Sequence, residues 1–139
     1  MARIVLISCV SKKLSHKVKA RNLYISPLFK YNLKYAESLN PDKIFILSAK
    51  FGLLNLEKQI APYEKTLNKM STEENKRWAA NVISQLRNVA DLDRDKFIFL
   101  AGAKYRRHLI SYIKNFEIPF EGFTIGKQLK YLKQKINRT

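Results

Sequence analysis

Cysteine and glycine are scarce in this sequence, and each scarcity excludes a class of site. The 139 residues contain one cysteine, Cys9, so no disulfide can form within the chain. No Cys/His cluster with zinc-ligand spacing accompanies it, which predicts a reducing, cytoplasmic location and no bound metal. There are four glycines, and neither a G-x-x-x-x-G-K-[ST] nor a G-x-G-x-x-G motif. These features argue against a dinucleotide-binding loop, and we expect no cofactor.

Long apolar runs are also missing. None approaches the roughly 20 residues that cross a bilayer, which excludes a membrane-spanning helix. A short apolar stretch at residues 4–10 follows Arg3 without a small-residue cleavage site, so we expect no signal peptide. Apolar residues nevertheless make up 46% of the chain, enough for one hydrophobic core, and we predict a single domain over residues 1–139.

Acidic residues are few, and they are absent from both ends of the chain. There are 27 Lys and Arg against 11 Asp and Glu, a formal net charge of +16; the first acid is Glu37 and none follows Glu121. Because neutralising phosphates releases condensed counterions, this distribution favours a nucleic acid as the partner. A general role in solubility is one alternative. The amphipathic C-terminal segment leaves a membrane surface as a less favoured one.

Apolar runs that alternate with helical patterns predict an α/β fold. Short apolar runs within 4–10, 43–49 and 96–101 predict strands, and the first, rich in β-branched residues, is typical of a strand buried on both faces. We expect a short edge strand at 118–123. Residues 11–21 and 50–70 lack strong periodicity, so we expect loops there, the second long and ordered.

Four segments show helical spacing. One helix begins at Pro27 after the capping residue Ser26 and ends at residues 40–41, and another begins with a capping box formed by Ser71 and Glu74. Segments 103–113 and 125–136 complete the set. Strands linked by helical crossovers predict a three-layer α/β/α domain with a mainly parallel sheet.

The three predicted strand ends share a pattern. Residues 8–13, 48–52 and 101–105 each place small residues before a lysine. Open α/β sheets bind ligands beyond the carboxyl ends of their strands, so we predict one shared anion-binding pocket there. The abundance of lysine is the competing explanation. Cys9 would need a base to act as a nucleophile, and only His16 is near in sequence, so a small buried thiol is the favoured interpretation.

Several short motifs resemble a known family. They are ISC with KK at 7–13, LYISPLF at 23–29, LSAKFGLL at 47–54, PYEKTL at 62–67, FLAG with a tyrosine at 99–105, and GKQL at 126–129. They cover nearly the whole chain and resemble a small bacterial and phage domain family of unknown function. The chain carries Glu64 where we expect an aspartate in that family.

This family is similar, more distantly, to YaaA-like proteins and to the uracil-DNA-glycosylase-like α/β fold, which also occurs in domains of tRNA-guanine transglycosylase relatives. The resemblance implies that fold and a DNA glycosylase-like hydrolase, which cleaves or exchanges the N-glycosidic bond of a base, hypermodified phage bases included. The resemblance also implies that the protein acts in DNA modification, DNA repair or phage defence, and it favours DNA over RNA as the partner.

Cleavage of an N-glycosidic bond needs a flipped-base pocket with an aromatic platform, hydrogen bonds to the base, and a carboxylate beside the sugar. We expect catalysis from Glu64, Lys50 and Tyr63, with Glu57 as the second-choice carboxylate. The expected base or ligand pocket consists of Ser8, Cys9, Lys12, Lys13, Tyr24, Ser48, Phe51, Gly52, Gly102 and Tyr105. The expected phosphate contacts are Lys17, Arg21, Lys104, Arg106 and Arg107. Core packing is the competing role for the aromatic residues, and a surface salt bridge for Glu64.

Two other functions fit the same residues. A non-catalytic basic module for DNA or RNA would share the charged surface but would need no pocket. An enzyme acting on a small nucleotide or ribosyl compound would use the strand-end lysines equally well. A deep pocket at the strand ends would favour either enzyme over the module.

Overall fold

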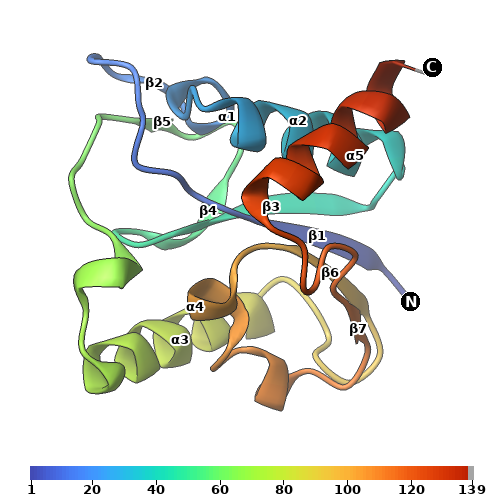
Figure 1. The fold of residues 1–139 in the computed structure, drawn as a ribbon. Helices are drawn as coiled ribbons and strands as arrows, with labels where there is room; N and C mark the ends of the chain where they lie inside the picture. Colours follow the sequence, from blue (N-terminus) through green and yellow to red (C-terminus); the bar gives the residue numbers. More distant parts are fainter. Residues whose placement is uncertain (138–139) are drawn as a thin grey trace.

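A five-stranded sheet forms the middle of the computed structural model, which describes residues 1–137 (Figure 1). Its strand order is β4-β3-β1-β6-β7. The strands are β1 (Arg3–Ser8), β3 (Lys43–Ser48), β4 (Gly52–Asn55), β6 (Lys96–Leu100) and β7 (Phe116–Glu117). All neighbouring pairs are parallel except β3 and β4, which are antiparallel. The three predicted strands and the mainly parallel sheet are therefore confirmed.

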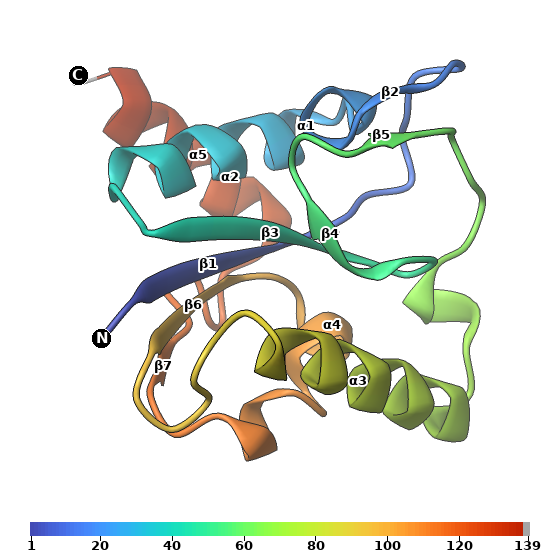
Figure 2. The same cartoon turned by 180° about the vertical axis from the view of Figure 1, so that it is seen from behind.

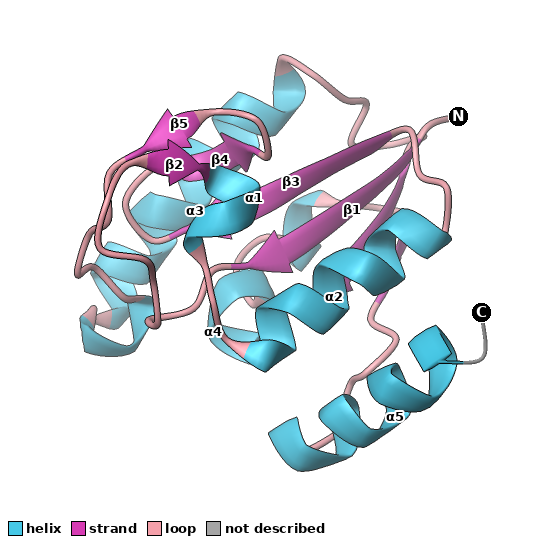
Figure 3. Cartoon of the chain, turned by 90° about the horizontal axis from the view of Figure 1, so that it is seen from above, coloured by secondary structure: helices cyan, strands magenta, loops and turns pink. Residues whose placement is uncertain are grey.

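Helices cover both faces of the sheet, as Figures 1 and 2 show from opposite sides. One layer contains α2 (Pro27–Ser38) and α5 (Ile125–Asn137), and the other contains α3 (Thr72–Arg87) and the short α4 (Ala103–Arg106). Seen from above, α2 lies across β1 with α5 at its side (Figure 3). The α/β/α layering is as predicted. No described helix is long and apolar enough to cross a membrane.

The two helix starts predicted from capping residues are both present. Ser26 Oγ accepts a hydrogen bond from the N–H of Phe29, and Pro27 occupies the first turn of α2. At α3, Ser71 Oγ accepts from the N–H of Glu74 while the Glu74 carboxylate accepts from the N–H of Ser71. Because these bonds satisfy donors that have no partner inside the helix, local sequence fixes where each helix begins.

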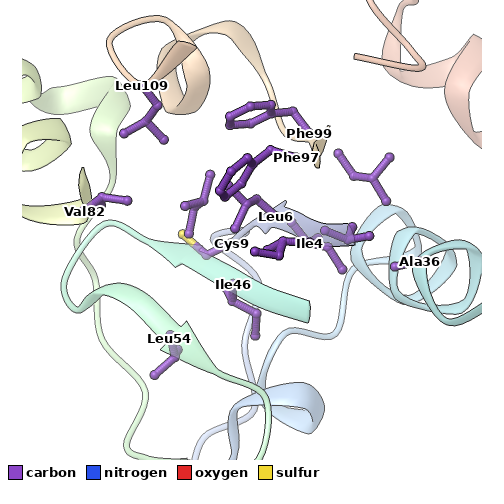
Figure 4. Packing of buried hydrophobic residues seen from close by; sticks show 14 of the residues in the cluster. Ile4, Leu6, Cys9, Ala36, Ile46, Leu54, Val82, Phe97, Phe99 and Leu109 are labelled. Atoms are coloured by element: carbon purple, nitrogen blue, oxygen red, sulfur yellow. The ribbon is translucent and has the colours of Figure 1, made fainter. Parts of the chain in front are cut away.

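The core lies between the two helix layers and the sheet. Figure 4 shows Ile4, Leu6, Ile46, Phe97 and Phe99 from the strands between Ala36 of α2 and Val82 of α3. Residues 4–7 of β1 are fully buried, as expected for a central parallel strand. Because β1 is held in the middle of this core, its carboxyl end lies at the centre of one edge of the sheet.

Two sequence expectations about local structure are wrong. The edge strand is β7, not 118–123, because Pro119 has no N–H and this segment closes two turns, from Glu121 N–H to Ile118 O and from Phe123 N–H to Phe120 O. The helix expected over 103–113 is divided into α4 and a 3₁₀ turn, η2 (Ile110–Tyr112). Backbone N–H groups at 109, 112 and 113 donate three residues back, which tightens the chain out of an α-helix.

The segments expected to be loops contain further elements. A small antiparallel pair joins β2 (Val18–Lys19) to β5 (Gln59–Ile60), with α1 (Ala20–Leu23) directly after β2. The segment 50–70 holds β4, β5 and the 3₁₀ turn η1 (Leu67–Lys69). The pair of β2 and β5 joins segments that are distant in the chain, which a periodicity argument does not detect. Strand β4 instead returns antiparallel to β3 across the short turn at 49–51.

A glutamine of α3 covers the outer edge of β4. Gln85 Oε1 accepts a hydrogen bond from the N–H of Leu53 at 2.8 Å, and Gln85 Nε2 donates to the carbonyl of Phe51 at 3.2 Å. Gly52 lies between these two contacts with φ of 72°, and a Cβ there would approach Gln85 Oε1 to 2.4 Å. The side-chain amide thus takes the place of a neighbouring strand at this position.

Candidate functional site

A cavity of about 410 Å³ opens at the carboxyl end of β1. Three parts of the chain form its wall: the residues after β1, the segment from 63 to 69, and α4. The lining residues are Cys9, Val10, Ser11, Lys13, Tyr63, Glu64, Lys65, Thr66, Lys69 and Tyr105. The volume lies within the range of small-molecule sites. The predicted strand end at 48–52 contributes no residue to the described lining, so the cavity is not the pocket expected to be shared by all three strand ends.

Backbone hydrogen bonds anchor both ends of the loop that follows β1. The N–H of Cys9 donates to the carbonyl of Leu47, which carries the chain one residue past the end of β1. Further on, Leu14 N–H donates to Leu23 O and Ile25 N–H donates to Lys12 O. The wall formed by Cys9 to Lys13 is therefore anchored to β3 on one side and to residues 23–25 on the other.

Behind the cavity lies a buried hydroxyl network that we call the tyrosine–serine cluster: Tyr24, Tyr63 and Ser48. The Tyr63 hydroxyl oxygen is 2.5 Å from that of Tyr24 and 2.7 Å from Ser48 Oγ. Ser48 Oγ also accepts hydrogen bonds from the N–H groups of Lys50 and Phe51. With both lone pairs of Ser48 occupied, its hydroxyl proton is left to donate to Tyr63. This contact fixes the Tyr63 ring in the cavity wall.

The phenols of this cluster remain neutral at physiological pH. Burial raises the pKa of Tyr63 and of Tyr24 well above the ordinary tyrosine value, and the Cys9 side chain adds to both shifts. A neutral phenol donates and accepts hydrogen bonds but does not act as a base. The catalytic role expected for Tyr63 is thereby narrowed to binding, orientation and hydrogen-bond donation.

Lys13 places a cation against the aromatic wall. Its Nζ lies 4.5 Å from the centroid of the Tyr63 ring and donates a hydrogen bond to Ser11 O at 3.2 Å. Burial lowers the pKa of this ammonium, and the nearby Cys9 and Glu64 side chains oppose the shift. The attraction between an ammonium and an aromatic face holds Lys13 where an anionic group entering the cavity would meet it.

The opposite wall joins Cys9 to α4. Cys9 Sγ is 3.3 Å from the Tyr105 hydroxyl, and the Tyr105 ring packs edge-on against Trp78 with centroids 5.7 Å apart. Burial, reinforced by Cys9, raises the pKa of Tyr105 above its ordinary value. His16 is exposed and is absent from the described cavity wall. The structure therefore supplies no imidazole base for Cys9 there, in agreement with the interpretation as a buried thiol.

Glu64 contributes the only carboxylate among the described lining residues. It is exposed at the rim and lies beside Lys65 in sequence, with Lys69 also in the wall. Glu57, the second-choice carboxylate, lies elsewhere: it forms ion pairs with Lys19 at 3.2 Å and with Arg21 at 2.8 Å. The geometry therefore favours Glu64 over Glu57 as the reactive carboxylate.

The structure brings together some of the predicted catalytic and pocket residues and separates others. Cys9, Lys13, Tyr63, Glu64 and Tyr105 share the cavity wall. Tyr24 and Ser48 are buried behind it, and Phe51 packs edge-on against Tyr63 with ring centroids 5.6 Å apart. The other predicted pocket residues, Ser8, Lys12, Gly52 and Gly102, are not among its described lining.

Each of the excluded residues has another position. Ser8 ends β1 in register with Leu47, and Lys12 is exposed. Gly52 begins β4 next to Gln85, and Gly102 lines a second, smaller cavity.

Lys50 also lies outside the cavity. Its ammonium is 5.3 Å from the centroid of the Phe51 ring, and it lines a separate hollow next to α3 together with Trp78 and Glu74. The reason is local, because Ser48 Oγ holds the N–H groups of residues 50 and 51 in a turn that leads to β4. This placement does not support the catalytic role expected for Lys50.

The predicted phosphate contacts divide into free and engaged side chains. Lys17, Lys104 and Arg107 are exposed. Arg21 is paired with Glu57, whereas Arg106 is half-buried and donates to the carbonyl of Ala101 at 2.6 Å. The exposed group remains suited to phosphate contact, and the engaged group has structural partners.

Sequence reasoning missed five lining residues: Val10, Ser11, Lys65, Thr66 and Lys69. The last three belong to or follow the PYEKTL motif at 62–67, of which only two residues were singled out. These residues reach the cavity because the chain turns at η1, where the Thr66 hydroxyl accepts a hydrogen bond from the N–H of Asn68. A motif-based prediction extended through residue 69 would have found Lys65, Thr66 and Lys69.

The chain belongs to a family described as "Family of unknown function (DUF6884)", whose model matches residues 4–134. No curated protein matches the sequence. The family match confirms the resemblance to a family of unknown function, over nearly the whole chain. The more distant similarity to YaaA-like proteins stays a prediction.

Proposed function

We propose that this member of the family hydrolyses the N-glycosidic bond of a base in nucleic acid, and that its domain has a uracil-DNA-glycosylase-like fold. One observation carries the proposal: the cavity at the carboxyl end of β1 combines a neutral phenol, one carboxylate and several ammonium groups. The three-layer arrangement around a mainly parallel sheet is compatible with that fold.

The cavity wall supplies the groups that bind a flipped base. The rings of Tyr63 and Tyr105 offer aromatic surface on which the base can stack, and the exposed Ser11 offers a hydroxyl for hydrogen bonding to its polar edge. Because the tyrosine–serine cluster holds Tyr63 from behind, its orientation is fixed before the substrate arrives. This preorganisation favours binding by reducing the ordering that binding requires.

The charges in the wall match those that develop during bond cleavage. As the bond from C1′ to the base nitrogen breaks, its electron pair leaves with the base and positive charge grows on the sugar. The Lys13 ammonium stabilises the departing base, and the Glu64 carboxylate stabilises the sugar and orients a water molecule. The water oxygen bonds to C1′, and its proton is transferred to the base, so the products are a free base and an abasic sugar.

The remaining cations at the rim suit the polymer that carries the base. Lys65 and Lys69 lie in the same wall as Glu64, and both are exposed. Phosphates of the flanking nucleotides would neutralise them, which supplies affinity without sequence preference. A purely structural role would not require these groups to gather around a pocket.

The proposal is tested by incubating the protein with unmodified and hypermodified phage DNA and identifying released bases by mass spectrometry. We expect base release by the wild type and a loss of at least a hundredfold in Glu64→Gln, with DNA affinity by fluorescence anisotropy unchanged. Glu73→Gln, an exposed carboxamide substitution in the first turn of α3, serves as the matched control. DNA binding without release of any base would leave a basic binding module as the function, and full activity of Glu64→Gln would remove the proposed role of this carboxylate.

A further inference from the structure

A second cavity lies next to the first, on the other side of α4. Its volume is about 230 Å³, and it opens at the carboxyl end of β6. Gly102, Ala103 and Arg106 contribute to its wall, together with the aromatic rings of Phe120 and Phe123. Since β1 and β6 are paired strands, about 5 Å apart, the two cavities are neighbours along one edge of the sheet.

The helical geometry of α4 explains why it separates the two cavities. Successive residues in a helix are rotated by about 100°, so Ala103 and Tyr105 point to nearly opposite sides. Tyr105 lines the first cavity and Ala103 lines the second. Lys104 and Arg107, three residues apart, share the solvent side between them and are both exposed.

The resulting surface has an ordered sequence of features: a cavity with aromatic walls, a ridge with two cations, and a second cavity with aromatic walls. No ion pair or side-chain hydrogen bond engages Lys104 or Arg107 within residues 1–137. A nucleic acid strand has the matching repeat, because a phosphate lies between each base and the next. A mononucleotide would occupy one cavity and leave the ridge and its neighbour unused.

We propose that the second cavity binds the base next to the one held in the first, with the intervening phosphate on Lys104 and Arg107. This inference rests on the proposed function and specifies its substrate as a single strand of at least two nucleotides. The Phe120 and Phe123 rings, with centroids 5.8 Å apart, offer the apolar surface for the neighbouring base. The half-buried Arg106 in that wall is already engaged, because it donates to the Ala101 carbonyl and forms an ion pair with Glu121 at 4.0 Å, so its role there is to shape the wall.

Gly102 permits a sharp test. A Cβ built there meets no atom within 4 Å, and its φ of −67° and ψ of 166° are open to any residue, so Gly102→Val should fold and place a branched side chain at the wall of the second cavity. Gly126→Val is the matched control, because Gly126 also has nothing within 4 Å and is not among the described residues lining either cavity.

Binding is measured by fluorescence anisotropy at low ionic strength with two labelled DNA trinucleotides of mixed sequence. One carries three bases, and the other carries only the central base between two abasic sites. Because stacking of a base on aromatic residues contributes about 1–3 kcal/mol, we expect the wild type to bind the first trinucleotide about fivefold to a hundredfold more tightly. Gly102→Val should bind both with the weaker affinity, and Gly126→Val should behave as the wild type.

Three results would overturn the second subsite: equal affinity of the wild type for both trinucleotides, undiminished preference in Gly102→Val, or no saturable binding of either. The base-release assay separates this failure from that of the proposed function. A wild type that prefers the complete trinucleotide but releases no base retains the subsite and loses the hydrolase. A wild type that releases a base without this preference retains the hydrolase and loses the subsite.

Discussion

Removing one hydroxyl from the tyrosine–serine cluster should destabilise the fold without changing its shape. Tyr63→Phe retains the ring, which is 9% exposed, and deletes the oxygen that lies 2.7 Å from Ser48 Oγ and 2.5 Å from the Tyr24 hydroxyl. Both partners are buried, so neither gains a hydrogen bond to water in exchange. Each is left with one hydrogen-bonding partner fewer.

The size of this loss follows from the number of broken contacts. An unsatisfied buried polar group costs about 1–3 kcal/mol, so we expect Tyr63→Phe to lower the free energy of unfolding by about 2 kcal/mol. Ser48→Ala should cost more, about 3 kcal/mol, because the N–H groups of Lys50 and Phe51 also lose their acceptor. For a domain of this size the first loss corresponds to a Tm lower by about 6 °C.

The assay is urea unfolding followed by tryptophan fluorescence. Trp78 is the single tryptophan and is 9% exposed, and its indole N–H donates to the backbone carbonyl of Ser48, which both variants retain. Tyr112→Phe is the matched control, since Tyr112 is 50% exposed. A loss in Tyr63→Phe no greater than in Tyr112→Phe, or a smaller loss in Ser48→Ala than in Tyr63→Phe, would refute the reasoning.

Three further predictions concern pH, backbone strain and salt. Burial raises the pKa of both phenols in the tyrosine–serine cluster, so their stabilising contribution is complete below about pH 10. Above that pH the free energy of unfolding should fall by about 1.4 kcal/mol per pH unit for each phenol. Urea melts with tyrosinate absorbance check this, and ionisation of all seven tyrosines in the folded protein near pH 10 would contradict it. Gly52→Ala should be less stable than Gly122→Ala in thermal melts by about 1–3 kcal/mol, since both have positive φ but only the first Cβ meets Gln85; equal losses would exclude a steric cause. Replacing Lys104 and Arg107 together with Ala should reduce the slope of log K against log salt for single-stranded DNA by about 1.4, and an unchanged slope would mean that neither contacts phosphate.

The sequence predicted the elements whose determinants are local. Strands β1, β3 and β6 are continuous apolar runs, and the starts of α2 and α3 are set by capping residues whose hydrogen bonds lie within one turn. The amphipathic spacing of α5 also predicted its helix correctly. In each case the segment of sequence that forms the element also contains the reason for it.

Elements stabilised from outside their own segment could not be predicted in this way. Strand β4 begins at a glycine with positive φ, and its outer edge is satisfied by Gln85, which is 32 residues from its partner Leu53. Strand β5 has two residues and depends on β2, about 40 positions earlier in the chain. No local pattern records the pairing of β5 with β2 or the contact of Gln85 with β4. The pairing of β4 with β3 is local, across the turn at 49–51, but the segment lacks the alternation that would have indicated a strand.

The candidate site was predicted only in part: five of the ten residues that line the cavity had been named from the sequence. Tyr24 and Ser48 were assigned to the pocket and Tyr63 to catalysis, whereas in the structure only Tyr63 reaches the cavity wall and the other two support it from behind. Lys65 and Lys69 were missed because 27 Lys and Arg in 139 residues make any one lysine uninformative. Distinguishing a supporting residue from a lining residue requires coordinates.

The contact of Gln85 with the edge of β4 has a consequence for hydrogen exchange at Leu53. The amide hydrogen of Leu53 is protected by a side chain of α3 and not by another strand. Whenever α3 separates from the sheet, this one amide becomes open to exchange with solvent deuterium while the ladder between β3 and β4 can remain intact. The Leu53 amide therefore reports on the docking of α3, and its exchange rate measures the free energy of separating α3 from the sheet.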